Sequence, residues 1–104
     1  MRRGDVVTVA LPGDYGKPRP ALIIQSDLFE TTAITLLPIT SHLEDLPLLR
    51  VGIGPEAGLQ QASQIQVDKP QTPRRGRIGR VIGRADETTM RAVNRALIVF
   101  LGLA

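Results

Sequence analysis

Cysteine is absent from the sequence, and histidine occurs once, at His42. Without cysteine the chain can form no disulfide framework, no thiolate nucleophile and no cysteine-based zinc site, and this composition suits a reducing cytoplasm. A single histidine excludes histidine-cluster metal sites and the nuclease chemistry that needs two histidines. We therefore expect a cytoplasmic protein that uses neither a metal ion nor a cofactor.

Aromatic residues and long apolar runs are also scarce. Only Tyr15, Phe29 and Phe100 are aromatic, so the core must be built from Val, Ile, Leu and Ala, within a hydrophobic fraction of 42%. The longest apolar run, residues 96–104, falls far short of the ~20 residues that span a bilayer, and the start lacks the long apolar stretch of a secretory signal. We expect no membrane partner and, at 104 residues, a single domain over residues 1–104.

Basic residues outnumber acidic ones by 13 to 10, which gives a formal net charge of +3 and a sequence pI near 10.2. This excess favours a polyanionic partner. Paired-carboxylate catalysis is excluded, because Glu44 and Asp45, like Asp86 and Glu87, are sequence neighbours whose side chains diverge. The glycines at 76, 79 and 83 match neither a P-loop nor a dinucleotide-binding motif.

Hydrophobic patterning predicts a run of short strands in the first part of the chain. Residues 6–11 and 63–68 alternate apolar and polar side chains with a period of two, as half-buried strands do. Glycines and prolines over residues 12–18 indicate a hairpin turn after the first strand. We also expect strands over 19–25, 33–39, 48–53 and around 78–82, a short helical turn from Ser26 to Thr31 or Thr32, and a turn or single helical turn over 54–58.

The C-terminal segment is predicted to form the long helix of the protein. Asp86 suits an N-cap, and the apolar residues from Met90 to Leu101 follow a helical spacing. Because the last two turns are apolar almost all round, we expect this end to be buried against a sheet or a second copy of the chain. Together these elements predict an α+β domain of barrel-like shape.

Arg19 and Thr40 are the polar residues that best suit chemistry on a phosphate. Arg19 stands between two prolines at the start of a strand, and its always charged, rigid guanidinium matches phosphate oxygens. Thr40, Ser41 and His42 follow the third strand, where hydroxyls can donate to a phosphoryl oxygen and an imidazole can carry a proton. The ordinary interpretations are an exposed arginine, hydroxyls that bond their own backbone, and a solvated histidine.

Two further groups are candidates for contact with RNA. Gln64, Gln66 and Asp68 form a polar stripe on one strand face, and such amides can read the base edges of single-stranded RNA. Arginines cluster at 74, 75, 77, 80 and 84, an electrostatic footprint that suits a phosphate backbone. The alternatives are a solvated strand face and a solvated basic turn. With so few aromatic residues, base stacking must be sparse and binding should depend on salt.

Four segments of the chain, taken in order, resemble the MazF/PemK family of toxins. They are Arg3 to Val7 with the turn that follows and Lys17 to Asp27; Leu37-Pro38-Ile39-Thr40; Gln64 to Lys69 with Arg77-Ile78-Gly79; and the terminal helix from Val93 to Leu103. The resemblance spans nearly the whole chain, and the order and spacing of the segments make it specific.

The resemblance implies an SH3-like β-barrel of five to seven short strands with a C-terminal helix, assembled as a homodimer. It also implies the toxin of a type II toxin–antitoxin system, a metal-independent endoribonuclease that cuts single-stranded RNA at short sequences. Attack by the ribose 2′-OH would leave 2′,3′-cyclic phosphate and 5′-OH ends. The partners implied are RNA and a cognate antitoxin protein, with DNA contacted only indirectly through the antitoxin complex.

The family's catalytic pair corresponds to Arg19 and Thr40 of this sequence. We expect His42 and Asp68 to be candidates for catalytic support, with Asp68 orienting RNA or Arg19, while the general base stays unassigned. The RNA-binding residues that we expect are Lys17, Ser41, Gln64, Gln66, Arg74, Arg75 and Arg77.

Two departures from the family pattern limit these expectations. The first hairpin loop, residues 12–18, is shorter than in many relatives, and Gln66 stands where some members use an arginine. Two other functions stay open: a toxin of the same fold that binds and poisons DNA gyrase, and an inactive SH3-like module that binds nucleic acid. A phosphate site at Arg19 and Thr40 favours the nuclease, because a gyrase binder has no reason to keep one.

Overall fold

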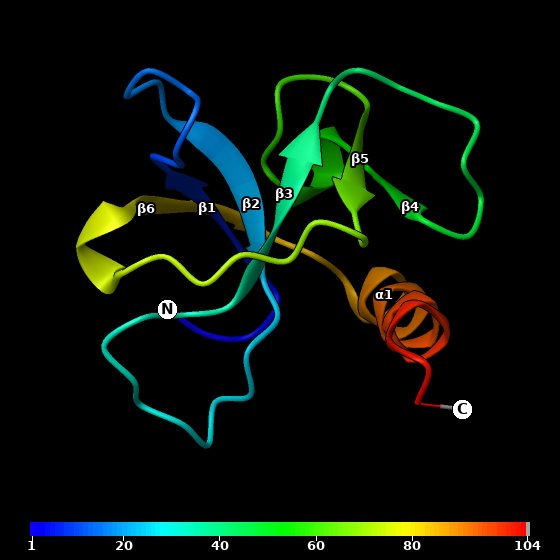
Figure 1. Cartoon of the computed structure of the whole chain (residues 1–104). Coiled ribbons are helices and arrows are strands. Elements are labelled where there is room, and N and C mark those ends of the chain that lie inside the picture. Colours follow the sequence, from blue (N-terminus) through cyan, green and yellow to red (C-terminus); the bar gives the residue numbers. More distant parts are fainter. Residues whose placement is uncertain (104) are drawn as a thin grey trace.

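Six short strands and a C-terminal helix form the structure, a computed structural model that describes residues 1–103 (Figure 1). All paired strands are antiparallel, in the order β4-β5-β3-β2-β1-β6. The elements are β1 (Asp5–Val9), β2 (Arg19–Ile23), β3 (Leu36–Thr40), β4 (Arg50–Ile53), the 3₁₀ turn η1 (Pro55–Ala57), β5 (Ser63–Gln66), the 3₁₀ turn η2 (Arg75–Arg77), β6 (Ile78–Arg84) and α1 (Glu87–Leu101).

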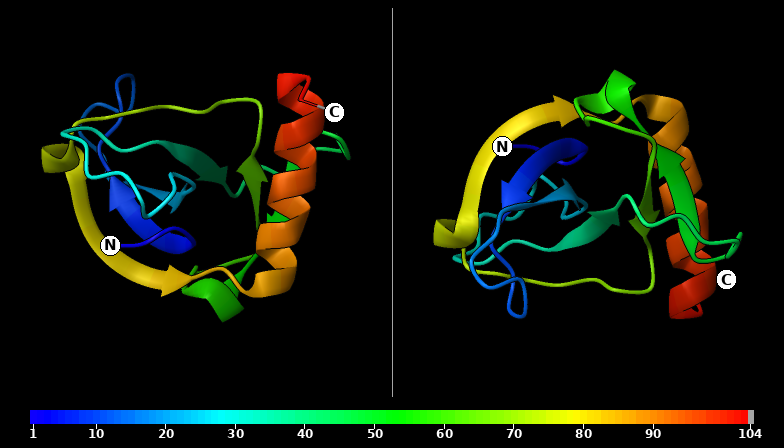
Figure 2. Two further views of the ribbon diagram at one scale, coloured as in Figure 1. Left: turned by 90° about the horizontal axis from the view of Figure 1, so that it is seen from below. Right: turned by 90° about the horizontal axis from the view of Figure 1, so that it is seen from above.

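The sheet is strongly curled, with β6 arching along one side of the molecule and α1 standing at the other (Figure 2). Within residues 1–103, no ladder joins β4 to β6, so the sheet stays open at its two outer strands. The predicted α+β class with a C-terminal helix is therefore confirmed, whereas closure into an SH3-like barrel stays a prediction.

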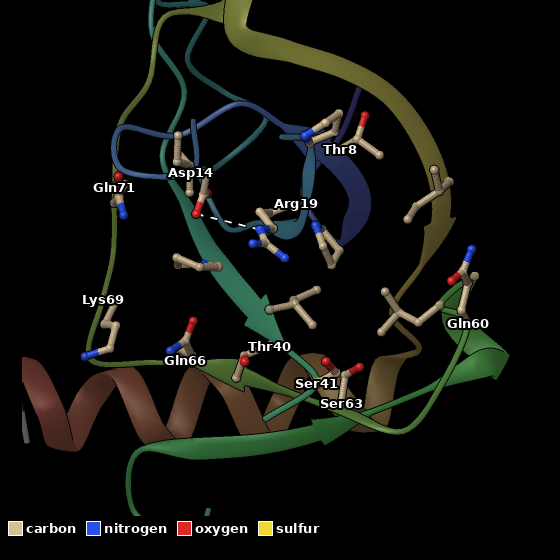
Figure 3. Close-up of a pocket in the computed structure, with 18 of the residues that line it drawn as sticks. Thr8, Asp14, Arg19, Thr40, Ser41, Gln60, Ser63, Gln66, Lys69 and Gln71 are labelled. Carbon is tan, nitrogen blue, oxygen red and sulfur yellow. Dashed lines mark ion pairs between the residues drawn. The ribbon is translucent and has the colours of Figure 1, made fainter. Parts of the chain in front are cut away.

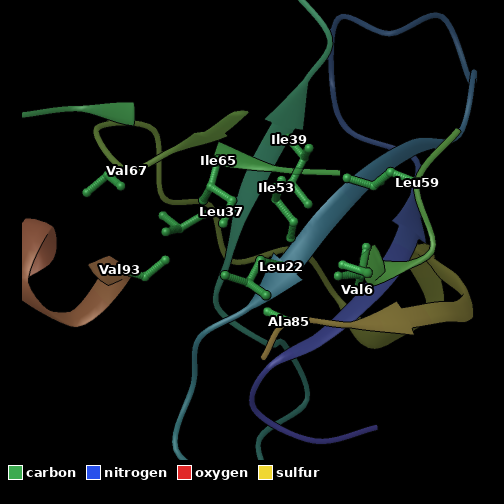
Figure 4. Close-up of a cluster of buried hydrophobic side chains, with 11 residues drawn as sticks. Val6, Leu22, Leu37, Ile39, Ile53, Leu59, Ile65, Val67, Ala85 and Val93 are labelled. Atoms are coloured by element: carbon green, nitrogen blue, oxygen red, sulfur yellow. The ribbon is translucent and has the colours of Figure 1, made fainter. Parts of the chain in front are cut away.

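The central strands are buried on both faces, which differs from the half-buried first strand that the alternation suggested. Val6, Leu22 and Leu37 lie side by side across β1, β2 and β3 and belong to one hydrophobic cluster (Figure 4). The intervening residues, such as Val7 and Ala21, point to a second cluster on the other face. Because the curled sheet covers both of its own faces, β1 carries apolar side chains at alternate and intervening positions.

Helix α1 begins and ends with the caps that its sequence indicates. The Asp86 carboxylate accepts a hydrogen bond from the backbone N–H of Thr89, and Gly102 ends the helix in the left-handed conformation. The hydrogen bonds from Thr89, through its backbone and its side chain, hold the pKa of the Asp86 carboxyl below its ordinary value. Val93 is buried in the first hydrophobic cluster, so this face anchors the helix to the sheet.

The C-terminal end of α1 is exposed in the single chain. Of the two expected partners, the sheet is therefore excluded, and burial against a second copy of the chain stays a prediction. Val99 is 60% exposed and Leu101 is 53% exposed, and Phe100 and Leu103 are exposed beside them. The helix leans on the sheet through Val93 and its half-buried neighbours, and its last turn extends past them. In the described part of the chain, no helix combines the length and apolar character needed to cross a membrane.

The segment between β2 and β3 also differs from the prediction. The expected helical turn after Ser26 is a simple turn, in which the Ser26 hydroxyl oxygen accepts from the Leu28 N–H and the Asp27 carboxylate from the Arg3 N–H. Strand β3 begins at Leu36, because the residues before it form only isolated bridges to the segment around residues 71–74. The single helical turn expected at 54–58 is present as η1.

Two glycines allow β6 to pass close to η1. A Cβ added at Gly83 would lie 1.8 Å from the carbonyl oxygen of Ala57, and one at Gly58 would lie 2.1 Å from the carbonyl oxygen of Ile82. Both neighbours are backbone atoms, so neither contact can relax by rotation of a side chain. The absence of side chains at these positions therefore sets the distance between β6 and η1.

We predict that Gly83→Ala lowers the free energy of unfolding by about 1–3 kcal/mol, as overpacking against backbone does. The matched control is Gly76→Ala, because a Cβ at Gly76 meets nothing within 4 Å; its effect should stay within about 0.5 kcal/mol. Thermal and urea unfolding of both variants would measure the difference. Equal midpoints for the two variants would contradict the steric argument.

Candidate active site

A cavity of about 1020 Å³ opens where β2 begins and β3 ends (Figure 3). The first hairpin loop, the segment from η1 to β5, the chain after β5 and the outer strand β6 complete its walls. Its lining is rich in side chains that carry charge or form hydrogen bonds. These are Thr8, Asp14, Arg19, Thr40, Ser41, Gln60, Gln61, Ser63, Gln66, Lys69, Gln71 and Arg80.

Arg19 and Thr40 reach this cavity together because of the register between β2 and β3. Ala21 lies opposite Pro38 in that antiparallel ladder. Arg19 precedes Ala21 by two residues and Thr40 follows Pro38 by two, so strand alternation places both side chains on the same face of the sheet, each just beyond the paired residues. The two residues that the sequence singled out thus line one cavity from adjacent strands.

The Arg19 guanidinium faces a carboxylate that the sequence analysis did not identify. Its Nε atom lies 3.7 Å from Oδ1 of Asp14, on the first hairpin loop, and the Arg19 side chain stays 54% exposed (Figure 3). Such a long, open ion pair is weak and can be exchanged for another anion. Among residues 1–103, Asp14 is the only acidic side chain that lines the cavity.

The Thr40 hydroxyl bonds the local backbone and still has a hydrogen to donate to a phosphoryl oxygen. Its oxygen accepts a hydrogen bond, 3.0 Å long, from the backbone N–H of His42, as a residue that starts a loop often does. The hydroxyl hydrogen is not used by that bond, so Thr40 can still donate to an oxyanion in the cavity. Ser41 lines the cavity beside it and adds a second hydroxyl.

Lys69 and Arg80 add positive charge to the cavity, although the sequence analysis named neither among the expected site residues. Lys69 follows β5 and Arg80 lies on β6, so they enter the lining from different walls. Arg80 belongs to the predicted arginine cluster, and Lys69 follows Asp68 in one of the family-like segments. Three cations against one carboxylate make the cavity attractive to an anion.

Three of the remaining candidates near β3 and β5 lie outside this lining: His42, Gln64 and Asp68. The His42 side chain is 81% exposed and its Nε2 lies 3.5 Å from Oε1 of Glu44. Asp68 lies 3.7 Å from Nζ of Lys69, so its charged partner is that lysine, and the partner of Arg19 is Asp14. Of the polar stripe on β5, Gln66 lines the cavity.

Most of the basic candidates also lie away from the cavity. Arg75 donates from Nε to the backbone oxygen of Thr31, and Arg74 forms a bridge with Ala33, so this turn contacts the segment before β3. Arg77 ends that turn, and Lys17 is exposed on the first hairpin loop. These four side chains can meet only a ligand that extends beyond the cavity.

Metal ligands do not cluster in the part of the chain that the structure describes. No three His, Asp or Glu side chains gather there in an arrangement that would hold an ion. The cavity lining offers a guanidinium, donating hydroxyls and two further cations. Such a set stabilises negative charge that develops on a bound phosphate.

Comparison with known proteins relates the whole chain to one group of toxins. A family model described as "PemK-like, MazF-like toxin of type II toxin-antitoxin system" matches residues 2–101. The chain is 48% identical to the "Probable endoribonuclease MazF" of Mycolicibacterium smegmatis over 108 residues, which span 100% of this chain and 99% of that protein.

Solved structures agree with this similarity in fold. Mycobacterium tuberculosis toxin MazF-mt6 superposes with a TM-score of 0.86 at 26% identity, over 96% of this chain and 98% of the toxin. A mycobacterial endoribonuclease in complex with its cognate antitoxin also gives a TM-score of 0.86, at 24% identity over 100% and 97% of the two chains. At that lower identity the match shows the fold alone.

Proposed function

The chain belongs to the PemK-like, MazF-like family of toxins, and on that premise we propose how its cavity acts on RNA. It is the toxin of a type II toxin–antitoxin system and an endoribonuclease. In our proposal the phosphate to be cut binds between Arg19 and Thr40. The observation that carries this proposal is the β2–β3 register, which brings the two side chains to one cavity.

The reaction is an attack of the ribose 2′-OH on the adjacent phosphodiester. The new P–O2′ bond forms as the P–O5′ bond breaks. The 2′-OH gives up its proton to water and the departing 5′ oxygen takes one from water, so the products are a 2′,3′-cyclic phosphate and a 5′-OH end. Arg19 exchanges the Asp14 carboxylate for the phosphate and stabilises the charge that develops on the phosphorane. Thr40 donates its hydroxyl hydrogen to a non-bridging oxygen. With a pKa above about 12, a guanidinium is a poor base at neutral pH, so Arg19 acts through its charge.

We predict that the purified protein cuts mixed RNA in EDTA and leaves 5′-OH ends. Arg19→Ala should abolish cutting, and Thr40→Val should slow it roughly 10²–10³-fold, the usual effect of losing one oxyanion donor. Arg95→Ala, on the exposed surface of α1, is the control that removes an equal charge. The measurement is mapping of RNA ends, with circular dichroism to verify folding.

Two results would contradict this assignment. Full activity of folded Arg19→Ala would remove that residue from the site. RNA binding without any cut by the wild-type protein would favour the gyrase-poisoning toxin or the inactive nucleic-acid-binding module.

The path of the RNA follows the cations of the cavity. Lys69 and Arg80 line the same cavity as Arg19 and Thr40, so they suit phosphates next to the one that is cut. Ser41 and Gln66 line the same space and suit contacts with the sugar or the base. Lys17, Gln64, Arg74, Arg75 and Arg77 lie outside the lining and would serve only a longer strand.

We predict that Arg80→Ala reduces the salt dependence of RNA binding, while Arg77→Ala leaves it nearly unchanged. Removing one phosphate contact should lower the slope of log K against log salt by about 0.7 for a single strand. Binding of a fully 2′-O-methylated RNA, which cannot be cut by its own 2′-OH, would measure the slope for both variants. If Arg77→Ala lowers this slope more than Arg80→Ala does, the RNA runs along η2 and not along β6.

The partners of this chain are RNA, a cognate antitoxin and a second copy of the chain. One structural match is a complex with its cognate antitoxin, and another, from Deinococcus radiodurans, is a MazE–MazF complex with a TM-score of 0.81 at 21% identity. DNA is contacted only through the antitoxin complex, and the cytoplasm is the expected location. The exposed apolar end of α1 is the surface that we expect a second copy of the chain to bind, because dimerisation would remove it from water.

We predict that the wild-type protein is a dimer and that Leu101→Glu shifts it to a monomer, because a carboxylate buried without a partner is costly. Leu28→Glu is the matched control, since Leu28 is 87% exposed on the loop between β2 and β3. Analytical ultracentrifugation measures the masses. A wild-type monomer, or a dimer that survives Leu101→Glu, would exclude this surface.

A further inference from the structure

Arg50 is a buried arginine that no step of the reaction described above uses. Its side chain, on β4, is only 7% exposed. Nη1 donates to the backbone oxygen of His42 at 3.2 Å and to Oε1 of Gln64 at 2.9 Å. Removing a guanidinium from water costs free energy unless it is well hydrogen-bonded, so we ask what the buried Arg50 side chain does.

The groups that Arg50 contacts belong to the turn that follows Thr40 and to β5, the strand paired with β3. Gln64 lies opposite Thr40 in the β3–β5 ladder. Its side-chain oxygen also accepts from the Glu44 N–H, and its Nε2 donates to the Glu44 backbone oxygen, both at 3.1 Å. The Glu44 carboxylate lies 3.9 Å from Nη2 of Arg50 and 3.5 Å from the His42 ring.

The His42 peptide connects this network to the cavity. Its backbone oxygen accepts from Arg50, and its backbone N–H donates to the Thr40 hydroxyl oxygen. The N–H therefore fixes which lone pair of Thr40 is occupied, and with it the direction in which the hydroxyl hydrogen can point. Arg50 thus bonds the turn through the peptide that bonds Thr40, and the Thr40 hydroxyl hydrogen stays available for a ligand in the cavity.

We propose that Arg50 is a positioning residue for RNA cleavage, which acts through the turn of residues 41–44 and the Thr40 hydroxyl. The inference rests on the proposed function, because Thr40 must contact the reacting phosphate. The proposal also changes the roles of two residues that the sequence analysis named. Gln64, expected to bind RNA, and His42, expected to support catalysis, hold Thr40 in place, and neither needs to contact RNA. Arg50 itself lies outside the cavity lining and touches no substrate.

If Arg50 is a positioning residue, its substitution should lower kcat much more than it changes KM or the stability of the fold. Arg50→Met keeps the bulk and removes the hydrogen bonds. The Glu44 side chain is 45% exposed, so the substitution leaves no carboxylate buried without a charged partner. We expect kcat to fall at least tenfold and KM to change less than threefold, because Arg19, Lys69 and Arg80 still bind phosphate. Arg50→Lys, which keeps the charge and one donor, should recover part of kcat. Arg91→Met, on the exposed face of α1, is the matched control.

The deciding measurement is a double-mutant cycle with Thr40→Val, made by single-turnover cleavage. If Arg50 acts through Thr40, Arg50→Met slows the Thr40→Val protein less than twofold further. Hydrogen exchange adds a readout independent of activity: the His42 amide should exchange at least tenfold faster in Arg50→Met, with the amides of β1 unchanged.

The possible failures are distinguishable. Wild-type cutting by Thr40→Val would overturn the proposed site and, with it, the role of Arg50. A slow Thr40→Val together with an unchanged kcat of Arg50→Met would overturn the Arg50 inference alone. Additive losses in the cycle, or faster exchange throughout the sheet, would make Arg50 a general structural residue and would also overturn it.

Discussion

The antiparallel register of β2 and β3 is the constraint on which the site depends. With Ala21 opposite Pro38, Arg19 and Thr40 lie on the same face just beyond the paired residues, and both line the cavity. A slip of one residue would turn one of the two side chains to the opposite face and separate them. Buried apolar residues on both faces of these strands hold that register, because a slip would also exchange the two hydrophobic clusters.

Charge in the cavity is arranged before any ligand arrives. Arg19, Lys69 and Arg80 come from three parts of the fold, and Asp14 partly neutralises them from a short hairpin loop. In the proposed reaction an RNA phosphate replaces the Asp14 carboxylate at Arg19, within a cavity that already holds two further cations. Preorganised charge of this kind stabilises a transition state more than charge that must first be oriented.

Residues of β5 and β4 hold the turn that follows Thr40. Gln64 of β5 bonds the Glu44 backbone, and Arg50 of β4 bonds Gln64 and the backbone oxygen of His42. The Thr40 hydroxyl oxygen accepts a bond from the His42 N–H, and this bond holds the oxygen in place. The proposed reaction uses the hydroxyl hydrogen, which that bond leaves free.

The sequence by itself determined the features that depend on near neighbours. Period-two alternation marked the strands, Asp86 marked the start of α1, and a resemblance carried by short motifs singled out Arg19 and Thr40. Only the tertiary structure decided which distant residues join them. Asp14, Lys69 and Arg80 meet at the cavity through strand order and sheet curvature, and the end of α1 stays exposed because the helix extends past the sheet. Periodicity reports which face a side chain takes on its own element, whereas contacts between elements depend on long-range register and twist, which no local pattern encodes.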